Sequence, residues 1–487
     1  MNPLKKLFQQ TAIYGLATVL PRMLNVILVP IYTAVMLPES YGEVIVIFAY
    51  FAIFNVFLAY GMETTFFRFY KETDQRKKVV TTSLLSILAT TLSFLIVGFL
   101  FKSSLSQLLE IKSKYIGYVF GILALDALAI IPFVWLRANE KPMRFAAVKI
   151  LNVCLNLGLN LFFLVALPNW VSPEGTGLFN SIYIEDFEIS YILISNLVAS
   201  GVTLVLLLPV YLRRPYVFDP WLWKRMMRYA MPVLVAGIAF TVNEVLDKIL
   251  LERLLPDEIA SAEVGKYGAC IKLAVFMTLF ATAFRMGIEP FFFSHSDSKN
   301  PQKAYAQITN YFVVLGSVIL LAVVVFADVL KELFVRDEAY WDAMPVVPII
   351  LLAAFFLGIY HNLSVWYKVT DRTKFGAYIS MIGAVLTIII NFALIQYFSY
   401  MASAIATLVA YGSMMALSFY FGRMYYPIPY NFRKIGFYLG VSIGFSILSF
   451  YIFDRNLIVG IVLLLLFLGM VYKLEADNLK KIFFKQT

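Results

Sequence analysis

The 487-residue chain has little of what soluble enzymes use for chemistry. It contains two histidines, His295 and His361. It also contains two cysteines, Cys154 and Cys270, which both lie within apolar stretches. The sequence holds no HExxH pattern, no pair of CxxC motifs and no Gly-rich phosphate loop, which argues against a catalytic metal and against ATP hydrolysis by this chain. We therefore expect no cofactor, no metal site and no enzymatic activity.

Charge is also scarce, because 14% of the residues are charged whereas 61% are hydrophobic. Soluble domains have roughly half of their residues apolar. Fourteen apolar stretches are each long enough to cross a bilayer, which takes about 20 residues. Hydrocarbon offers no partner for a free N–H or C=O, and the stretches lack the alternation of a barrel strand, so we expect helices. The predicted spans are 10–36, 42–63, 79–101, 115–137, 144–167, 188–212, 229–254, 264–290, 304–331, 343–368, 374–398, 401–423, 434–453 and 457–473.

We also expect no cleavable signal, and the sequence has no long loop. The first apolar stretch continues to Met36 without a small-residue cleavage site, so we interpret it as a span. The longest external connection is about 20 residues, which is too short to fold as a domain. Functional groups are therefore expected within or between the helices.

The net charge of +10 is concentrated in loops on one side. Loops on the amino-terminal side carry roughly 28 Lys and Arg, and the opposite loops carry about 8. This asymmetry and the even number of spans predict a multi-pass membrane protein with both termini in the cytoplasm. We interpret the basic loops as topology signals that contact lipid headgroups, and we expect no nucleic-acid partner.

A repeat divides the chain near its middle. Residues 41–67 align without gaps with residues 267–293, an offset of 226 residues. The matched residues are Tyr41-Gly42 with Tyr267-Gly268, Gly61 with Gly287, Glu63 with Glu289, and Phe66-Phe67 with Phe292-Phe293, and at the same offset Arg22 falls on Lys248. Chance similarity between apolar segments is the alternative explanation.

Six spans separate equivalent points of this repeat, so the two halves have the same orientation in the membrane. We expect an all-α polytopic membrane protein with fourteen transmembrane helices, in which two six-helix lobes are related by a parallel repeat and two helices follow. The predicted parts are an N-lobe over 1–212, a cytoplasmic interfacial linker over 213–228, a C-lobe over 229–423, and helices 13 and 14 with a cytoplasmic tail over 424–487.

Ionisable side chains within the spans predict a wet cavity, because each costs roughly 2.5–3.5 kcal/mol to insert. Guanidinium and ammonium groups are suited to a phosphate or diphosphate, although pairing with nearby acids such as Glu244 is the alternative for Lys248. The candidate anion-binding residues are Arg22, Lys248, Lys272 and Arg285.

Carboxylates within the spans are candidates for carrying a coupling ion, H⁺ or Na⁺. Asp126 is the most isolated of them and is the favoured candidate. The others are Glu63, Asp247 and Glu289. Glu63 and Glu289 lie near helix ends, where pairing with Arg68 or Arg285 is an equally good explanation.

Amide side chains recur on one face of the fifth span, one turn apart, at Asn152, Asn156 and Asn160. Amides offer the donors and acceptors that sugar hydroxyls need, but polar residues also join neighbouring helices in membranes. The aromatic residues of the tenth span, such as Trp366, are more typical of an interfacial belt than of a sugar-stacking site.

The segments PRMLNVILVPIYTAVMLPESYGEV (21–44), GMETTFFRFY (61–70) and the KYG…GIEPFFF of the eighth span resemble the polysaccharide-exporter family, which includes O-antigen flippases. This family belongs to the multidrug/oligosaccharidyl-lipid/polysaccharide exporter superfamily. The resemblance covers the whole chain. It implies a flippase that moves undecaprenyl-diphosphate-linked oligosaccharide across the inner membrane by alternating access, with a cationic central cavity.

The resemblance also implies partners, namely the lipid-linked oligosaccharide, membrane lipid, a coupling H⁺ or Na⁺, and the glycan polymerase and glycosyltransferases of the same pathway. A cation-coupled multidrug exporter is the alternative within transport. A membrane glycan polymerase or ligase is the alternative in another class, although the longest external loop lacks Arg and His.

Overall fold

The computed structural model describes residues 23, 26–72, 75–171, 179–212, 215–294 and 300–483, and their side chains except those of 72, 287, 289–291, 293–294 and 477–483. All regular structure in these residues is helical, as the hydropathy predicts. The chain forms two compact units, Met1–Gly265 and Lys266–Thr487.

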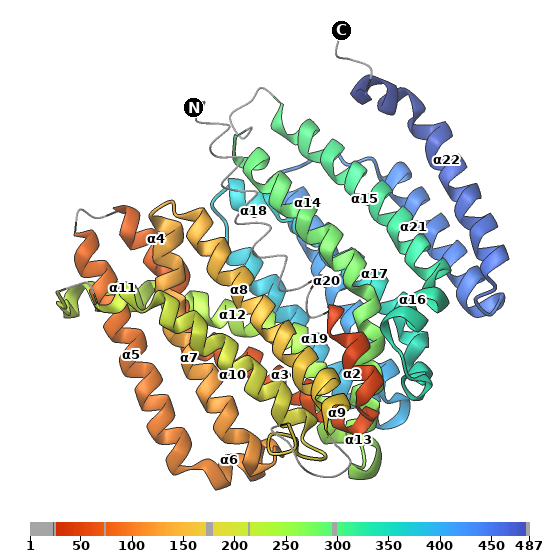
Figure 1. The fold of residues 1–487 in the computed structure, drawn as a ribbon. Coiled ribbons are helices and arrows are strands. Elements are labelled where there is room, and N and C mark those ends of the chain that lie inside the picture. Colours follow the sequence, from red (N-terminus) through yellow and green to blue (C-terminus); the bar gives the residue numbers. More distant parts are fainter. Residues whose placement is uncertain are drawn as a thin grey trace. The chain divides into compact units, whose positions relative to one another are not determined.

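The first unit consists of long helices joined by short connections (Figure 1). Its helices are α2 (Val29–Val35), α3 (Pro38–Ala59), α4 (Met62–Glu72), α5 (Arg76–Leu100), α6 (Lys102–Leu109), α7 (Ser113–Ala138), α8 (Pro142–Leu161), a π-helical turn η1 (Phe162–Ala166), α9 (Leu167–Trp170), α10 (Glu188–Leu207), α11 (Pro209–Leu212) and α12 (Pro220–Leu254).

Helix α13 (Asp257–Cys270) begins in the first unit and ends in the second. The second unit continues with a 3₁₀ turn η2 (Ile271–Ala274), α14 (Val275–Ser294), α15 (Pro301–Val325), α16 (Ala327–Phe334), a 3₁₀ segment η3 (Glu338–Val346), α17 (Val347–Leu363), α18 (Val365–Val369), α19 (Lys374–Phe398), α20 (Tyr400–Tyr425), α21 (Phe432–Ile447), a π-helical turn η4 (Leu448–Ile452) and α22 (Leu457–Phe483). Within this unit α15 packs against both α21 and α22.

Twelve helical segments among the described residues are long and apolar enough to cross a membrane, and each coincides with a predicted span. The first predicted span, 10–36, lies largely outside the described residues. The seventh predicted span is the carboxyl-terminal part of α12. That helix begins at Pro220 rather than at 229, so part of the segment predicted as a linker is helical.

The start of α12 is fixed by a proline and a carboxylate cap. Pro220 occupies the first turn, and the side chain of Asp219 accepts a hydrogen bond from the backbone N–H of Leu222 at 3.0 Å. The Asp219 carboxylate also pairs with Lys78 on α5, at 3.5 Å. These contacts attach the connection before α12 to α5.

The repeated segments differ in where their helices break. The first copy breaks between α3 and α4, where Tyr60 and Gly61 have φ values of 30° and 70°. A Cβ on Gly61 would also lie 2.7 Å from the carbonyl oxygen of Ala230 on α12, so glycine suits both the backbone and the packing. The second copy is continuous at Gly287 and instead changes to a 3₁₀ turn at η2.

Helices α3 and α13 approach so closely that their backbones touch. A Cβ on Gly42 would lie 1.8 Å from the carbonyl oxygen of Ser261, and a Cβ on Gly265 would lie 2.0 Å from that of Pro38. Small residues permit such close helix contacts in membranes, where van der Waals packing drives association. This crossing therefore depends on both glycines.

Candidate functional site

Asp126, which has no charged residue near it within its predicted span, lies in a polar cluster of the first unit. Asp126 is on α7, and its Oδ1 accepts a hydrogen bond from Ser200 Oγ on α10 at 2.7 Å. Lys149 on α8 interacts electrostatically with the same carboxylate. Three helices therefore contribute polar groups around a side chain that the sequence alone shows as solitary.

Lys149 is not among the site residues that the sequence predicts. Its ammonium lies 4.3 Å from the ring centroid of Phe133, a cation–π contact to α7. The sequence does contain a signal for this residue, because Lys149 precedes Asn152 by three positions and so lies on the same face of α8 as the asparagines.

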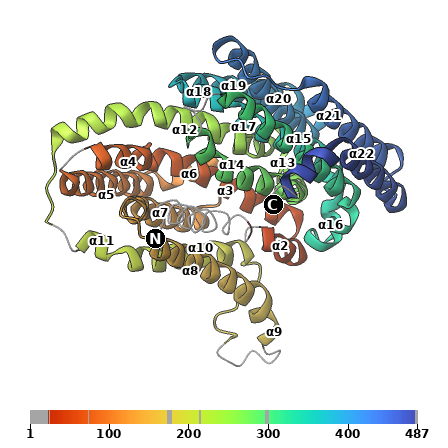
Figure 2. The ribbon, with the colours of Figure 1, turned by 90° about the horizontal axis from the view of Figure 1, so that it is seen from above.

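The asparagines of α8 join this helix to its neighbours, and Figure 2 shows α8 beside α10. Asn152 Nδ2 donates to Thr203 Oγ1 on α10 at 2.9 Å. The fully buried Asn160 donates to Asn156 Oδ1 at 2.9 Å and accepts from the hydroxyl of Tyr32 on α2 at 3.0 Å. Interhelical bonding thus accounts for Asn152 and Asn160, and the predicted contact with a glycan stays a prediction.

Glu63 has a partner from a different helix. At the start of α4 its Oε1 lies 2.6 Å from Arg137 Nη1 at the end of α7, and the Glu63 side chain is about half exposed. The Arg137 guanidinium also lies 4.9 Å from the ring centroid of Phe67. Exposed ion pairs contribute little stability, so this contact adds little to the stability of the first unit.

Lys248 on α12 pairs with its sequence neighbour. Its Nζ lies 2.7 Å from Asp247 Oδ1 and donates to the carbonyl oxygen of Glu244 at 2.9 Å. The side chains of Lys248 and Asp247 are 15% and 3% exposed, so the pair is largely removed from solvent. One predicted anion-binding residue and one predicted coupling residue therefore pair with each other in this structure.

The other described cations of the predicted anion site belong to the second unit. Arg285 on α14 lies 3.4 Å, Nη1 to Nε2, from His361 on α17, and both side chains are half-buried. Lys272 is half-buried in the 3₁₀ turn η2. Arg22 and the side chain of Glu289 lie outside the described residues. Their predicted roles, like the joint anion site, stay predictions.

Trp366 differs from the interfacial residue that its position near a helix end suggests. It is 1% exposed on α18, and its ring stacks on Tyr425 of α20 at 5.9 Å between centroids. Gly422 makes room for it, because a Cβ there would lie 2.9 Å from the indole. Trp366 is thus a core residue of the second unit, which sequence position could not reveal.

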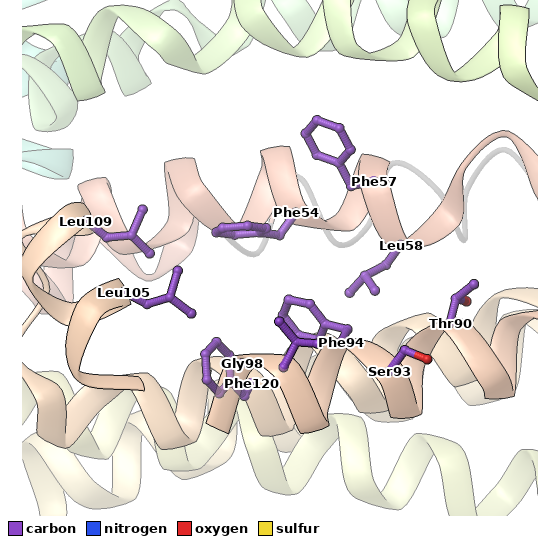
Figure 3. Close-up of a pocket in the computed structure, with 11 residues that line it drawn as sticks. Phe54, Phe57, Leu58, Thr90, Ser93, Phe94, Gly98, Leu105, Leu109 and Phe120 are labelled. Atoms are coloured by element: carbon purple, nitrogen blue, oxygen red, sulfur yellow. The ribbon is translucent and has the colours of Figure 1, made fainter. Parts of the chain in front are cut away.

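An apolar groove of about 460 Å³ opens in the first unit between α3, α5, α6 and α7 (Figure 3). Phe54 of α3 lies across it from Phe94 of α5, at 6.1 Å between ring centroids, and Leu105 and Leu109 of α6 lie at one end. Thr90 and Ser93 are the hydroxyl-bearing residues of its lining. Such a lining suits a hydrocarbon chain better than a sugar.

The helical fold and the apolar spans together define a multi-pass membrane protein. The sequence profile of the polysaccharide biosynthesis protein family matches residues 7–275, and this chain belongs to that family. The profile of the MatE family matches residues 232–393. A comparison with curated protein sequences finds no significant match.

Solved structures with the same fold belong to the multidrug/oligosaccharidyl-lipid/polysaccharide exporter superfamily. The lipid II flippase MurJ, in an inward-closed conformation, is 13% identical with a TM-score of 0.73, and the alignment covers 94% of this chain and 98% of MurJ. An inward-facing multidrug-resistance MATE transporter is 12% identical with a TM-score of 0.65, covering 86% of this chain and 96% of that one. A transporter of the superfamily from Pyrococcus furiosus is 13% identical with a TM-score of 0.59, covering 87% and 96%. At these identities the likeness establishes the fold.

Proposed function

We propose that this protein is a flippase that moves undecaprenyl-diphosphate-linked oligosaccharide from the inner to the outer leaflet of the cytoplasmic membrane. The family match over residues 7–275 carries the proposal, because it links the chain to polysaccharide biosynthesis. The similarity in fold to a lipid II flippase supports a lipid-linked glycan as the cargo. The product would serve surface polysaccharides such as the O-antigen of lipopolysaccharide.

The chemistry of the first unit is compatible with an amphiphilic cargo. The groove around Phe54 and Phe94 offers an apolar surface for part of a polyprenyl chain, whereas α8 carries Lys149 and Asn156 within the span. We assign the diphosphate to Arg22, Lys248, Lys272 and Arg285, and the sugars to Asn152, Asn156 and Asn160.

Transport proceeds in this proposal by alternating access of two lobes, 1–212 and 229–423, with both termini in the cytoplasm. Asp126 carries the coupling H⁺ or Na⁺, with Glu63, Asp247 and Glu289 as further candidates. A glycosyltransferase supplies the lipid-linked oligosaccharide, and a glycan polymerase consumes it on the other side.

A second candidate is a cation-coupled multidrug exporter, which the MatE match over residues 232–393 favours. The two candidates differ in the charge of the cargo. A diphosphate-linked lipid is an anion and requires cations in the cavity, whereas a cationic drug requires carboxylates or aromatic rings.

The deciding experiment uses the purified full-length protein in proteoliposomes that contain a fluorescent polyprenyl-diphosphate oligosaccharide. A membrane-impermeant quencher measures how much of the label reaches the outer leaflet, with and without a proton or sodium gradient. We expect the label to be translocated, whereas a fluorescent phosphatidylcholine in matched vesicles should stay in place. Equal movement of both lipids, or movement only of a cationic dye, would reject the flippase.

A further inference from the structure

A second cavity, of about 540 Å³, lies in the second unit where α20 ends and α21 and α15 begin. Because α20 and α21 belong to two apolar spans, 400–425 and 432–452, the cavity is at the membrane boundary. The three helix ends lie on one side of the membrane, which the distribution of basic loops predicts to be the cytoplasmic side. The cavity contains none of the residues assigned to the proposed cargo.

The charged residues described in the lining of this cavity are both cations. Lys303 on α15 and Arg423 on α20 both line it, and both side chains are exposed. Neither forms an ion pair or a hydrogen bond with any residue that the structure describes. Asn300 and Gln302 add amide groups, and the lining residues that the structure describes include no carboxylate. Two cations and two amides with donors available are suited to an anion with several oxygens.

Aromatic side chains form much of the apolar lining, and contacts between their rings fix their positions. Phe419 packs against Phe432 at 5.0 Å and against Tyr430 at 6.2 Å between ring centroids. The connection between α20 and α21 contains Pro427 and Pro429, whose rings restrict φ, and it ends where Asn431 caps α21 by accepting from the N–H of Lys434 at 3.1 Å. The cavity wall is therefore preformed, which lowers the entropy lost when a ligand binds.

We propose that this cavity binds an anionic phospholipid of the cytoplasmic leaflet, with the lipid phosphate at Lys303 and Arg423 and the start of an acyl chain against Phe419 and Phe432. At the membrane boundary a lipid phosphate lies at the level of the cationic side chains, and its acyl chain lies at the level of the aromatic rings. Basic cavities between membrane helices bind anionic lipid headgroups by the same combination of charge and position. A soluble phosphate compound shares the phosphate chemistry but makes no use of the aromatic wall.

The test is native mass spectrometry of the detergent-purified full chain with added phosphatidylglycerol or with zwitterionic phosphatidylethanolamine. We expect phosphatidylglycerol to bind the wild-type protein preferentially. In Lys303→Gln/Arg423→Gln its affinity should fall at least about tenfold, since charge-assisted bonds to the phosphate are lost. Arg423→Lys should keep part of the affinity, because the charge remains.

The matched control is Lys224→Gln/Arg228→Gln on α12, which removes the same charge from exposed residues of the basic interfacial segment that do not line the cavity. Because this segment contacts headgroups only by general charge attraction, the control should lower phosphatidylglycerol affinity much less than the cavity double variant does, and all variants should melt at the same temperature without lipid. Undiminished binding by the Lys303/Arg423 double variant would overturn the proposal. Binding of millimolar inorganic phosphate at Lys303 and Arg423 without a preference for phosphatidylglycerol would overturn the lipid assignment in favour of a soluble phosphate ligand.

Discussion

Asp126 Oδ1 and Ser200 Oγ lie 2.7 Å apart, so a hydroxyl on α10 donates to the carboxylate that we propose as the coupling residue on α7. A proton on Asp126 would change both this bond and the electrostatic interaction with Lys149. If Asp126 carries the coupling ion, as we propose, its loading and unloading would therefore be linked to the contacts among three helices.

Asp126→Asn tests this assignment while preserving the contact, since an amide oxygen can still accept from Ser200. We expect gradient-driven flipping in proteoliposomes to be abolished and binding of the lipid-linked oligosaccharide to be largely retained. Ser200→Ala removes the hydrogen bond but keeps the carboxylate, and should transport at a reduced rate. Wild-type gradient dependence in Asp126→Asn would remove Asp126 from the mechanism.

A test of the anion site requires a variant that removes the positive charge without destabilising the protein through an unpaired buried charge. Lys248→Ala removes the ammonium that lies 2.7 Å from Asp247, and removing one partner of a buried ion pair costs about 3–5 kcal/mol. Asp247→Asn/Lys248→Gln removes both charges together. We expect this double variant to accumulate in the membrane to near wild-type amounts and yet to deliver little glycan to the outer leaflet in a flippase-deficient strain. Full complementation would show that Lys248 does not bind the diphosphate.

Arg22 gives a test that is independent of Lys248. Arg22→Ala should strongly reduce flipping while the protein still inserts, and Arg22→Lys should retain part of the activity because the charge persists without the bidentate guanidinium. The readout is delivery of glycan to the outer leaflet, normalised to the amount of protein on a membrane blot. Equal activity of the alanine and lysine variants would exclude a role for positive charge at this position.

The crossing of α3 and α13 can be tested by adding a single methyl group. Gly42→Ala places a Cβ about where the Ser261 carbonyl lies, and overpacking of this kind costs roughly 1–3 kcal/mol. We expect a lower melting temperature in detergent by circular dichroism. Gly117→Ala on α7 is the control, because a Cβ there meets no atom within 4 Å. An unchanged melting temperature for Gly42→Ala would show that the two helices can separate without loss of stability.

The orientation in the membrane is tested with single cysteines in a Cys154→Ala background, because Cys154 is exposed and Cys270 is buried. Cysteines at Gly175 and Ser399 should react with an impermeant thiol reagent added outside intact cells, and a cysteine at Gln75 should not. Protection at Gly175 together with labelling at Gln75 would reverse the proposed topology.

The sequence predicts the helices well because the length and hydropathy of a span are local properties. It did not predict the break at Tyr60 and Gly61, the 3₁₀ turn at η2 or the π-helical turns at η1 and η4, since these depend on neighbouring helices. The repeat could not predict the break either, because Gly61 lies between α3 and α4 whereas its counterpart Gly287 lies inside α14.

The site was predicted less completely than the fold. Periodicity placed Asn152, Asn156 and Asn160 on one face of a helix, but it could not say which helix that face would meet. The partners Thr203 and Tyr32 are distant in sequence, as is Arg137 from Glu63. Of these additional residues, Lys149 alone could have been predicted from the sequence, because its spacing from Asn152 places it on the same face of α8.

The ion pair of Lys248 and Asp247 has a consequence for the response to membrane voltage. One elementary charge moved through the whole transmembrane potential is worth about 2.3 kcal/mol per 100 mV. The pair has no net charge, so a movement of α12 that carries both side chains together does almost no electrical work. Replacing Asp247 by asparagine would leave the charge of Lys248 uncompensated within the pair, and the same movement would then become voltage-dependent.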